Sequence, residues 1–195
     1  MSRNRSPMSK DIMCYLGAVA FSWALEAPEL ASRLFPFIVL IRVGFFGILR
    51  PGEFLGLSVC DLEFGEDEQG CPSVTLAIAA PKTRRFGGRS QFSLITDLQT
   101  IKWLRWLCEG LPTAVRLWPS SSHVFSSTLR TVLHRGRLND SRFSPASLCA
   151  GGAAEPISSG MEVGRLRFLG GVLEIRDHDD IICAGGYDSK GLGQA

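Results

Sequence analysis

Residues 47–57, GILRPGEFLGL, decide the fold that we expect for this chain. Gly47 favours the end of a preceding helix. Pro51 suits the first position of a new helix, because the N–H that proline lacks would be unpaired there in any case. Glu53 then lies in the first turn, where the helix dipole favours a carboxylate. The pattern therefore predicts a sharp junction between two helices, with Arg50 at the start of the second.

Two helices are expected before this junction. Residues 9–24 have helical spacing of their apolar side chains, and Ser9 is a suitable N-cap. From residue 28 a second stretch, residues 28–46, is apolar nearly all round, which is typical of a central helix. Pro36 and Arg42 interrupt the longest apolar run, so we interpret it as a buried core helix and not as a membrane span.

After the junction, loops, two strands and short helices are expected. Residues 61–68 predict an acidic loop. Residues 73–79 alternate with period two and predict a strand, and residues 91–95 predict its partner across a Gly-Gly turn. Further helices are predicted from an Asp97 cap to Gly110, over 128–135, from Ser144-Pro145 onward, and over 161–169. The third of these is expected to end near Ala150, because two glycines and a proline follow.

These elements predict a mainly α domain with a small inserted β-hairpin or sheet, an α+β arrangement, over residues 9–182. Residues 1–8 are expected to form a disordered basic N-terminus. Residues 183–195 are expected to form a disordered tail, because glycines and acidic residues occur there without periodicity.

The charged residues are strongly segregated along the 195-residue chain. Its net charge is only +2, and with 45% hydrophobic residues it is not a disordered chain. Residues 82–142, however, hold 11 basic and 3 acidic side chains, a net charge of +8. Such a block suits a phosphate-binding surface. Solvated helix faces would explain the charge equally well.

The cysteines stand at irregular spacing, at positions 14, 60, 71, 108, 149 and 183. No two of them form a CxxC pair, and no metal site is expected. No apolar segment of a secretory signal follows the basic N-terminus, so we expect an intracellular protein with reduced, mostly buried thiols and no membrane contact. The motifs GxxxxGK[ST], GxGxxG and HExxH are absent, and no cofactor is expected.

Three motifs, in this order, resemble those of the tyrosine recombinases, the phage-integrase-like catalytic domains. GILRPGEFLGL (47–57) resembles their first arginine box, PKTRR (81–85) their hairpin lysine, and FSPASLCAGGA (143–153) their second arginine box. RLRFLG (165–170) resembles the approach to the third box. The likeness covers residues 9–182 and is most marked to integrase-like sequences of eukaryotic mobile elements.

The resemblance implies a fold of the DNA breaking–rejoining type and a reaction in which a tyrosine attacks a DNA phosphodiester. Two arginines clamp the phosphate oxygens, and a lysine protonates the leaving oxygen. Residue by residue, Arg50 matches the first arginine and Lys82 the lysine. Arg84, Arg85 and Arg89 would then face the phosphates of duplex DNA.

Other positions depart from the motifs of the family. Ala146 stands at the histidine position, Cys149 at the second arginine, Val172 at the tryptophan and Ile181 at the tyrosine. Losing one clamp donor costs about 3–4 kcal/mol of transition-state stabilisation, and here several groups are missing together. We therefore expect a degenerate domain that does not cleave DNA. Tyr187, beyond the tyrosine position, is a poor substitute because it follows two glycines.

The sequence leads to one hypothesis and two alternatives. The hypothesis is a pseudoenzyme, a mobile-element remnant that binds duplex DNA weakly through phosphates, allows a homo-oligomer on DNA and acts in the nucleus. The first alternative is an active recombinase that uses Tyr187 or a tyrosine supplied in trans. The second is a structural or interaction protein that does not bind DNA, in which Arg50 pairs with an acidic neighbour and Lys82 lies in a solvated turn.

Overall fold

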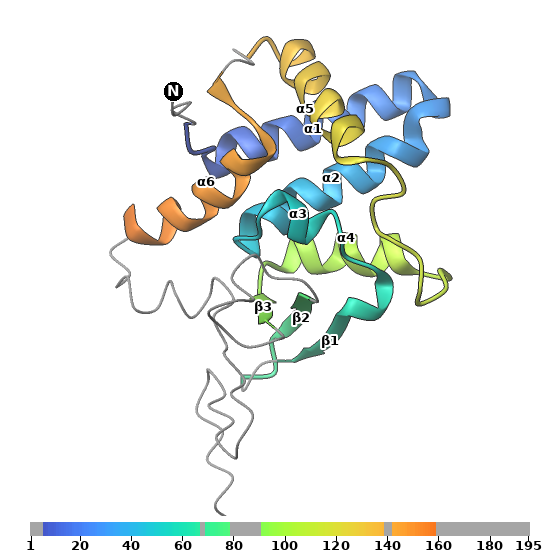
Figure 1. The fold of residues 1–195 in the computed structure, drawn as a ribbon, viewed down its shortest axis with the longest axis vertical. Helices are drawn as coiled ribbons and strands as arrows, with labels where there is room; N and C mark the ends of the chain where they lie inside the picture. Colours follow the sequence, from blue (N-terminus) through green and yellow to red (C-terminus); the bar gives the residue numbers. More distant parts are fainter. Residues whose placement is uncertain (1–5, 67–68, 79–90, 139–141, 159–195) are drawn as a thin grey trace, which may run out of the picture.

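A computed structural model describes residues 6–66, 69–78, 91–138 and 142–158, and in it a group of helices covers one face of a small sheet (Figure 1). The order is α1 (Lys10–Glu26), the short 3-10 helix η1 (Pro28–Leu30), α2 (Ala31–Phe46), α3 (Pro51–Phe54), the 3-10 turn η2 (Val59–Asp61), β1 (Leu62–Glu66), β2 (Pro72–Ile78), β3 (Gln91–Ile95), α4 (Leu98–Cys108), α5 (Ser122–Arg135) and α6 (Pro145–Ser158). The predicted mainly α architecture with a small inserted sheet is confirmed.

The helix α2 is the centre of the fold, as its sequence predicts. Ten of its sixteen residues are buried, Pro36 among them, and it packs against α1, α4 and α6. The helix α1 begins where expected, since the Ser9 hydroxyl accepts a hydrogen bond from the Ile12 amide at 3.3 Å. Residues 6–8 extend this domain beyond the expected boundary at Ser9, because Met8 is fully buried and its amide donates to the Ser147 carbonyl.

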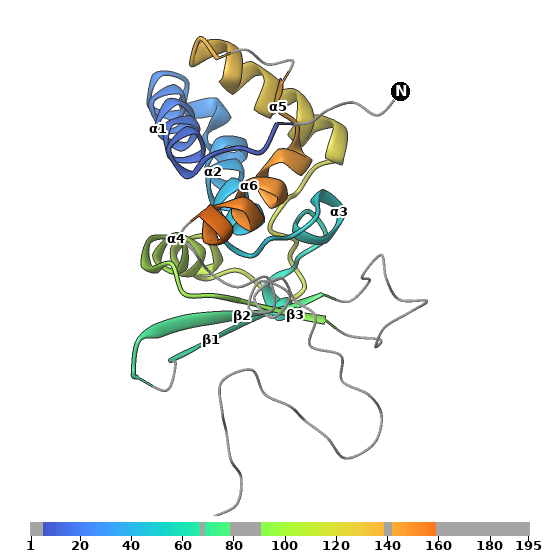
Figure 2. The ribbon, with the colours of Figure 1, turned by 90° about the vertical axis from the view of Figure 1, so that its left-hand side faces the viewer.

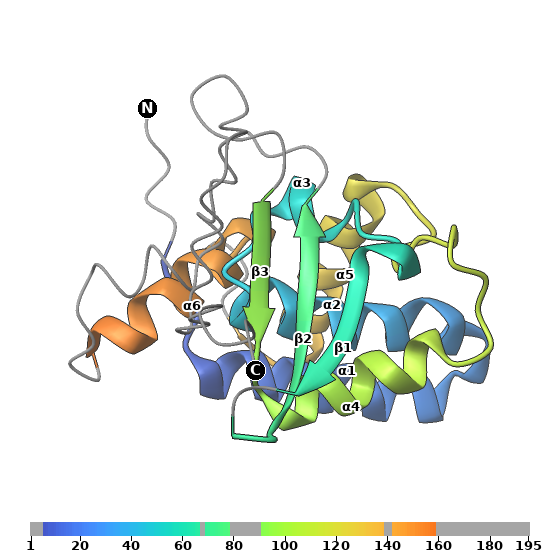
Figure 3. The same ribbon diagram turned by 90° about the horizontal axis from the view of Figure 1, so that it is seen from below.

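The sheet is antiparallel with the order β1-β2-β3 (Figure 3). The helix α4 lies between this sheet and α2, so the strands carry the helical layer on one side (Figure 2). The predicted strands β2 and β3 are confirmed, with Val74 opposite Ile95.

The predicted acidic loop at residues 61–68 is wrong for residues 62–66, which form β1. Leu62 and Phe64 pair with Leu76 and Val74 of β2 and pack against the core. Glu63 lies on the opposite face from these two residues, and Glu66, at the end of the strand, is also exposed. The negative charges in the sequence therefore obscured an ordinary alternation of apolar and polar residues.

Two helices are longer than the sequence predicts. The helix α5 begins at Ser122 and not at residue 128, because the Ser121 hydroxyl caps it by accepting from the Val124 amide at 3.3 Å. The helix α6 continues past Gly151 and Gly152 to Ser158. A Cβ on Gly152 would lie 1.9 Å from the Phe45 carbonyl oxygen, so this glycine lets α6 touch the end of α2.

The cysteines differ from the expectation of mostly buried thiols. The thiols of Cys14, Cys60 and Cys71 are exposed and those of Cys108 and Cys149 are partly buried, and none of these five described cysteines forms a disulfide bond. Cys14, Cys108 and Cys149 lie on α-helices, Cys60 lies in the 3-10 turn η2, and Cys71 lies between β1 and β2. The predicted helix over 161–169, the tail over 183–195 and the connection between β2 and β3 lie outside the described residues. In the described ranges, no helix is both long and apolar enough to cross a membrane.

A partly buried network joins α2 to the start of α4. The Arg42 guanidinium donates to Asp97 Oδ2 at 2.7 Å and to Thr100 Oγ1 at 3.0 Å, and the Thr100 hydroxyl donates to Asp97 at 2.7 Å. Burial alone would raise the pKa of Asp97. The hydrogen bonds from Thr100 and Arg42 outweigh burial and place that pKa below its ordinary value of 3.8.

We predict that Gly152→Ala lowers the free energy of unfolding by about 3 kcal/mol, because the new Cβ would force α6 away from α2. The matched control is Gly52→Ala, where a Cβ meets no atom within 4 Å. Its unfolding free energy should change by less than about 1 kcal/mol. Urea denaturation followed by circular dichroism measures both. Equal effects of the two substitutions would show that the close helix contact is unimportant.

We also predict that Asp97→Asn destabilises the protein at pH 7 and that its deficit shrinks in acid. Because the pKa of this carboxyl is depressed by folding, its contribution is complete above about pH 4. The contribution is lost as the pH falls through the depressed value. Unfolding free energies of wild type and variant, measured by urea denaturation at several pH values from 7 to below 3.8, should therefore converge. A constant difference across this range would contradict the network.

Candidate nucleic-acid interface

The junction after α2 fixes the backbone that presents Arg50. The Gly47 amide donates to the Val43 carbonyl at 2.9 Å and ends the helix. Ile48 then takes a φ of 52°, a left-handed conformation that is strained for a β-branched residue. The Ser93 hydroxyl of β3 donates to the Gly47 carbonyl at 2.8 Å in a buried position. The turn is thus held from both the helix side and the sheet side.

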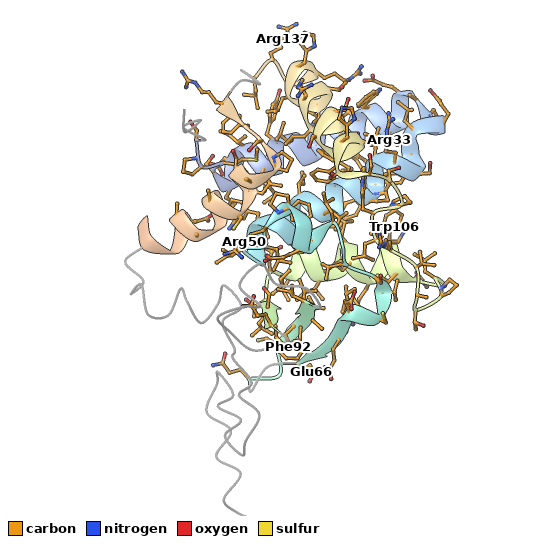
Figure 4. All side chains as sticks on the ribbon, viewed as in Figure 1. Arg33, Arg50, Glu66, Phe92, Trp106 and Arg137 are labelled. Atoms are coloured by element: carbon orange, nitrogen blue, oxygen red, sulfur yellow. The ribbon has the colours of Figure 1, made fainter. Side chains whose placement is uncertain are left out.

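Arg50 is the N-cap residue of α3 and forms an ion pair with the first turn of that helix. Its amide donates to Glu53 Oε2 at 2.7 Å, and its Nη1 lies 3.4 Å from Glu53 Oε1. The Arg50 side chain is 49% exposed, and the Glu53 side chain is only 10% exposed. The pairing with an acidic neighbour that the sequence left open is therefore present. It leaves half of the arginine side chain facing solvent (Figure 4).

Cys149 of α6 lies at the same junction. Its thiol donates to the strained Ile48 carbonyl, with Sγ 3.1 Å from the oxygen. Burial raises the pKa of the Cys149 thiol, the Glu53 carboxylate raises it further, and Arg50 opposes them. The thiol is therefore neutral at physiological pH. Cys149 and Arg50, far apart in the sequence, therefore lie at the same junction.

The charges at this junction nearly cancel. Arg50 carries the positive charge, Glu53 offsets it, and Cys149 adds none. A phosphate entering here meets one half-exposed guanidinium and no second cation from α6. This set of groups can bind a phosphate oxygen, but it is poorly suited to stabilise the extra negative charge of a phosphoryl transition state.

A cavity of about 340 Å³ lies next to this junction, between α3, α5 and the start of α6. Among the described residues, its lining contains no acidic side chain and one cation, Arg130, which the sequence predicts only as part of a short basic helix. The lining residues are Pro51, Ser126, Leu129, Arg130, Leu133, Phe143, Ser144, Pro145 and Ala146. The high positive charge of residues 82–142 was the signal that could have drawn attention to it.

Solved structures of site-specific recombinases share this arrangement of elements. A pre-cleavage complex of the XerH site-specific recombinase with its difH substrate matches with a TM-score of 0.63 at 12% identity, over 85% of this chain and 46% of that one. The post-cleavage complex with a palindromic difH substrate matches with a TM-score of 0.64 at 13% identity, over 86% and 46%. The XerA recombinase matches with a TM-score of 0.58 at 13% identity, over 87% and 55%.

The chain has the fold of a tyrosine recombinase catalytic domain. It spans about half the length of the recombinases that it matches. No family model and no curated protein sequence matches this chain. The shared fold is therefore established by structural similarity, at sequence identities of 12% to 13%.

The other predicted site residues lie outside the described ranges. Lys82, Arg84, Arg85 and Arg89 belong to the connection between β2 and β3, whose flanking residues Ile78 and Gln91 face each other across the pair of strands. Ser93, in the middle of β3, donates to the carbonyl of Gly47 and so ties this strand to the turn before Arg50.

Val172 and Ile181 stand at the tryptophan and tyrosine positions of the recombinase motifs. Both fall outside the described residues, as does Tyr187. Their assignments remain predictions. Among the residues that the structure does describe, no group of three or more histidine, cysteine or acidic side chains is arranged to hold a metal ion.

We predict that Cys149 reacts with iodoacetamide at least about tenfold more slowly than the exposed Cys60 in the folded protein at pH 8, because only the thiolate is nucleophilic and the pKa of Cys149 is raised. Mass spectrometry of the modified peptides measures both rates in one sample. The two rates should approach each other in about 8 M urea, which unfolds most domains. Equal rates in the folded chain would contradict the neutral, sheltered thiol.

Proposed function

We propose that this chain is a DNA-binding pseudoenzyme of the recombinase fold, which holds the phosphates of duplex DNA without cutting the strand. It derives from a mobile-element integrase, binds DNA weakly, forms a homo-oligomer on DNA and acts in the nucleus. The fold, the half-exposed Arg50 and the net charge of +8 over residues 82–142 support DNA binding. In this proposal Lys82, Arg84, Arg85 and Arg89 contribute phosphate contacts beside Arg50.

The observation that carries the proposal is the neutral thiol beside Arg50. Cys149 matches the second arginine of the motif, and it lies against the Ile48 carbonyl where no charge is supplied. Glu53 further offsets the retained arginine. Removing one such phosphate donor costs about 3–4 kcal/mol in the transition state, whereas phosphate binding in the ground state needs only net positive charge nearby. Binding therefore survives a loss that ends cleavage.

The expected DNA binding has a clear electrostatic signature. Fluorescence anisotropy of a labelled duplex, titrated with the full chain at several salt concentrations, should give a log–log slope of several units. Lys82→Ala and Arg85→Ala should each reduce this slope by about one. Undetectable duplex binding by a folded sample would favour the alternative of a structural or interaction protein.

The absence of cleavage is tested with a nicked suicide duplex, on which an active recombinase becomes covalently trapped. We expect no covalent adduct on a denaturing gel. An adduct that disappears in Tyr187→Phe would instead identify the active recombinase of the first alternative. An adduct that requires an added second protein would point to a tyrosine in trans. Either result would overturn the pseudoenzyme.

Restoring the missing charge provides a sharper test of the site. Cys149→Arg should tighten duplex binding and raise the salt slope by about one, because a guanidinium would then stand beside Arg50. The matched control is Cys60→Arg, which adds the same charge at an exposed cysteine. Cys149→Arg should gain more affinity than Cys60→Arg. Equal gains would show that charge alone matters, and not its place at the junction.

A further inference from the structure

The cavity beside the junction has the polarity of an anion site. It lies next to Pro51, the residue that follows Arg50, and its described lining residues include serines and an arginine but no carboxylate. Its volume of about 340 Å³ is roughly ten times that of a water molecule in the liquid, so it admits a hydrated oxyanion. Ala146 forms part of the wall, and its small side chain leaves that space open.

Arg130 is the cation of this cavity. Its side chain is exposed, and within the described ranges it makes no hydrogen bond or ion pair. Three other arginines of the helical layer are paired with carboxylates, Arg42 with Asp97, Arg50 with Glu53 and Arg135 with Glu26. Arg130 therefore retains its full capacity to bind an oxyanion with a planar pair of N–H donors.

The opposite wall offers donors from the start of α6. Ser144 lines the cavity, and its hydroxyl oxygen is buried and has no hydrogen-bond partner among the described residues. In a usual N-cap, the Ser144 hydroxyl would accept a hydrogen bond from a backbone amide of the first turn. Here the Ser144 amide instead donates to the Ser147 hydroxyl at 3.1 Å. No acidic residue occupies the first turn of this fourteen-residue helix. The positive end of the helix dipole thus faces the cavity uncompensated.

We propose that this cavity binds one phosphate group of duplex DNA between Arg130 and the first turn of α6. Arg130 then supplies, from α5, the second cation that Cys149 does not supply from α6. The proposal rests on the proposed DNA-binding function and adds a residue and a subsite to it. The ligand chemistry is a tetrahedral oxyanion, which a free phosphate ion shares with the DNA backbone, and the experiment separates these two sources.

The first comparison is between Arg130, within α5, and Arg137, which follows the end of that helix. Arg130→Gln should weaken duplex binding several-fold and lower the salt slope by about one. Arg137→Gln removes an equal charge beyond the end of α5, well away from Arg50 (Figure 4), and should change the affinity much less. Arg130→Lys should retain part of the binding, because it keeps the charge without the planar fork. Equal losses in Arg130→Gln and Arg137→Gln would overturn the subsite.

The second comparison fills the cavity without changing its charge. Ala146→Leu should weaken duplex binding, whereas Ala154→Leu, at an exposed position two turns along the same helix, should not. Circular dichroism checks that both variants are folded. Unchanged binding in Ala146→Leu would overturn the proposal, because a phosphate that enters the cavity cannot tolerate a leucine there.

Inorganic phosphate, followed by phosphorus NMR, distinguishes the two sources of the anion. We expect the phosphate ion to bind more weakly than the duplex, and both affinities to fall in Arg130→Gln. Phosphate-ion binding that Arg130→Gln abolishes while duplex binding stays intact would assign the cavity to small anions and overturn its role on DNA. Failure of the wild-type chain to bind any duplex would instead remove the proposed function itself.

Discussion

The close contact between α6 and the end of α2 is the constraint on which the site depends. Gly152 has no Cβ, and the Phe45 carbonyl occupies the space that a Cβ would need. Because an α-helix is rigid over a few turns, this contact also fixes the residues that precede it on α6. Cys149 is thereby held against the Ile48 carbonyl, and Ala146 is held at the wall of the cavity.

Because of this contact, the stability of the fold does not depend on which charges the site carries. The junction is held by backbone groups, by the buried Ser93 hydroxyl and by apolar packing of Leu49 and Phe54. None of these interactions needs a charge at position 149, where a neutral thiol satisfies the Ile48 carbonyl. A recombinase fold can therefore persist after its phosphate clamp is lost, because packing and not catalysis determines its stability.

The sequence predicted features that depend on neighbouring residues better than features that depend on contacts between distant segments. The caps at Ser9 and Asp97 and the alternation in β2 are local, and the structure contains them as predicted. The structure also places Cys149 at the junction that presents Arg50. The strand β1 was missed because acidic residues mask its alternation. The length of α6 was missed because the role of Gly152 is visible only when α2 lies beside it.

Arg130 escaped the sequence analysis for the same reason, since three separated segments form its cavity. The solvent exposure of Arg130 also explains how a cation can support DNA binding without supporting cleavage. A cation in contact with solvent attracts a ground-state phosphate and a transition state by similar amounts, because water screens the additional charge. Such uniform binding raises affinity without lowering the barrier. A clamp arginine held at the position of Cys149, inside the junction, would discriminate between the two states. In the proposed pseudoenzyme, a second cation on α5 in place of one on α6 would therefore preserve DNA binding without supporting catalysis.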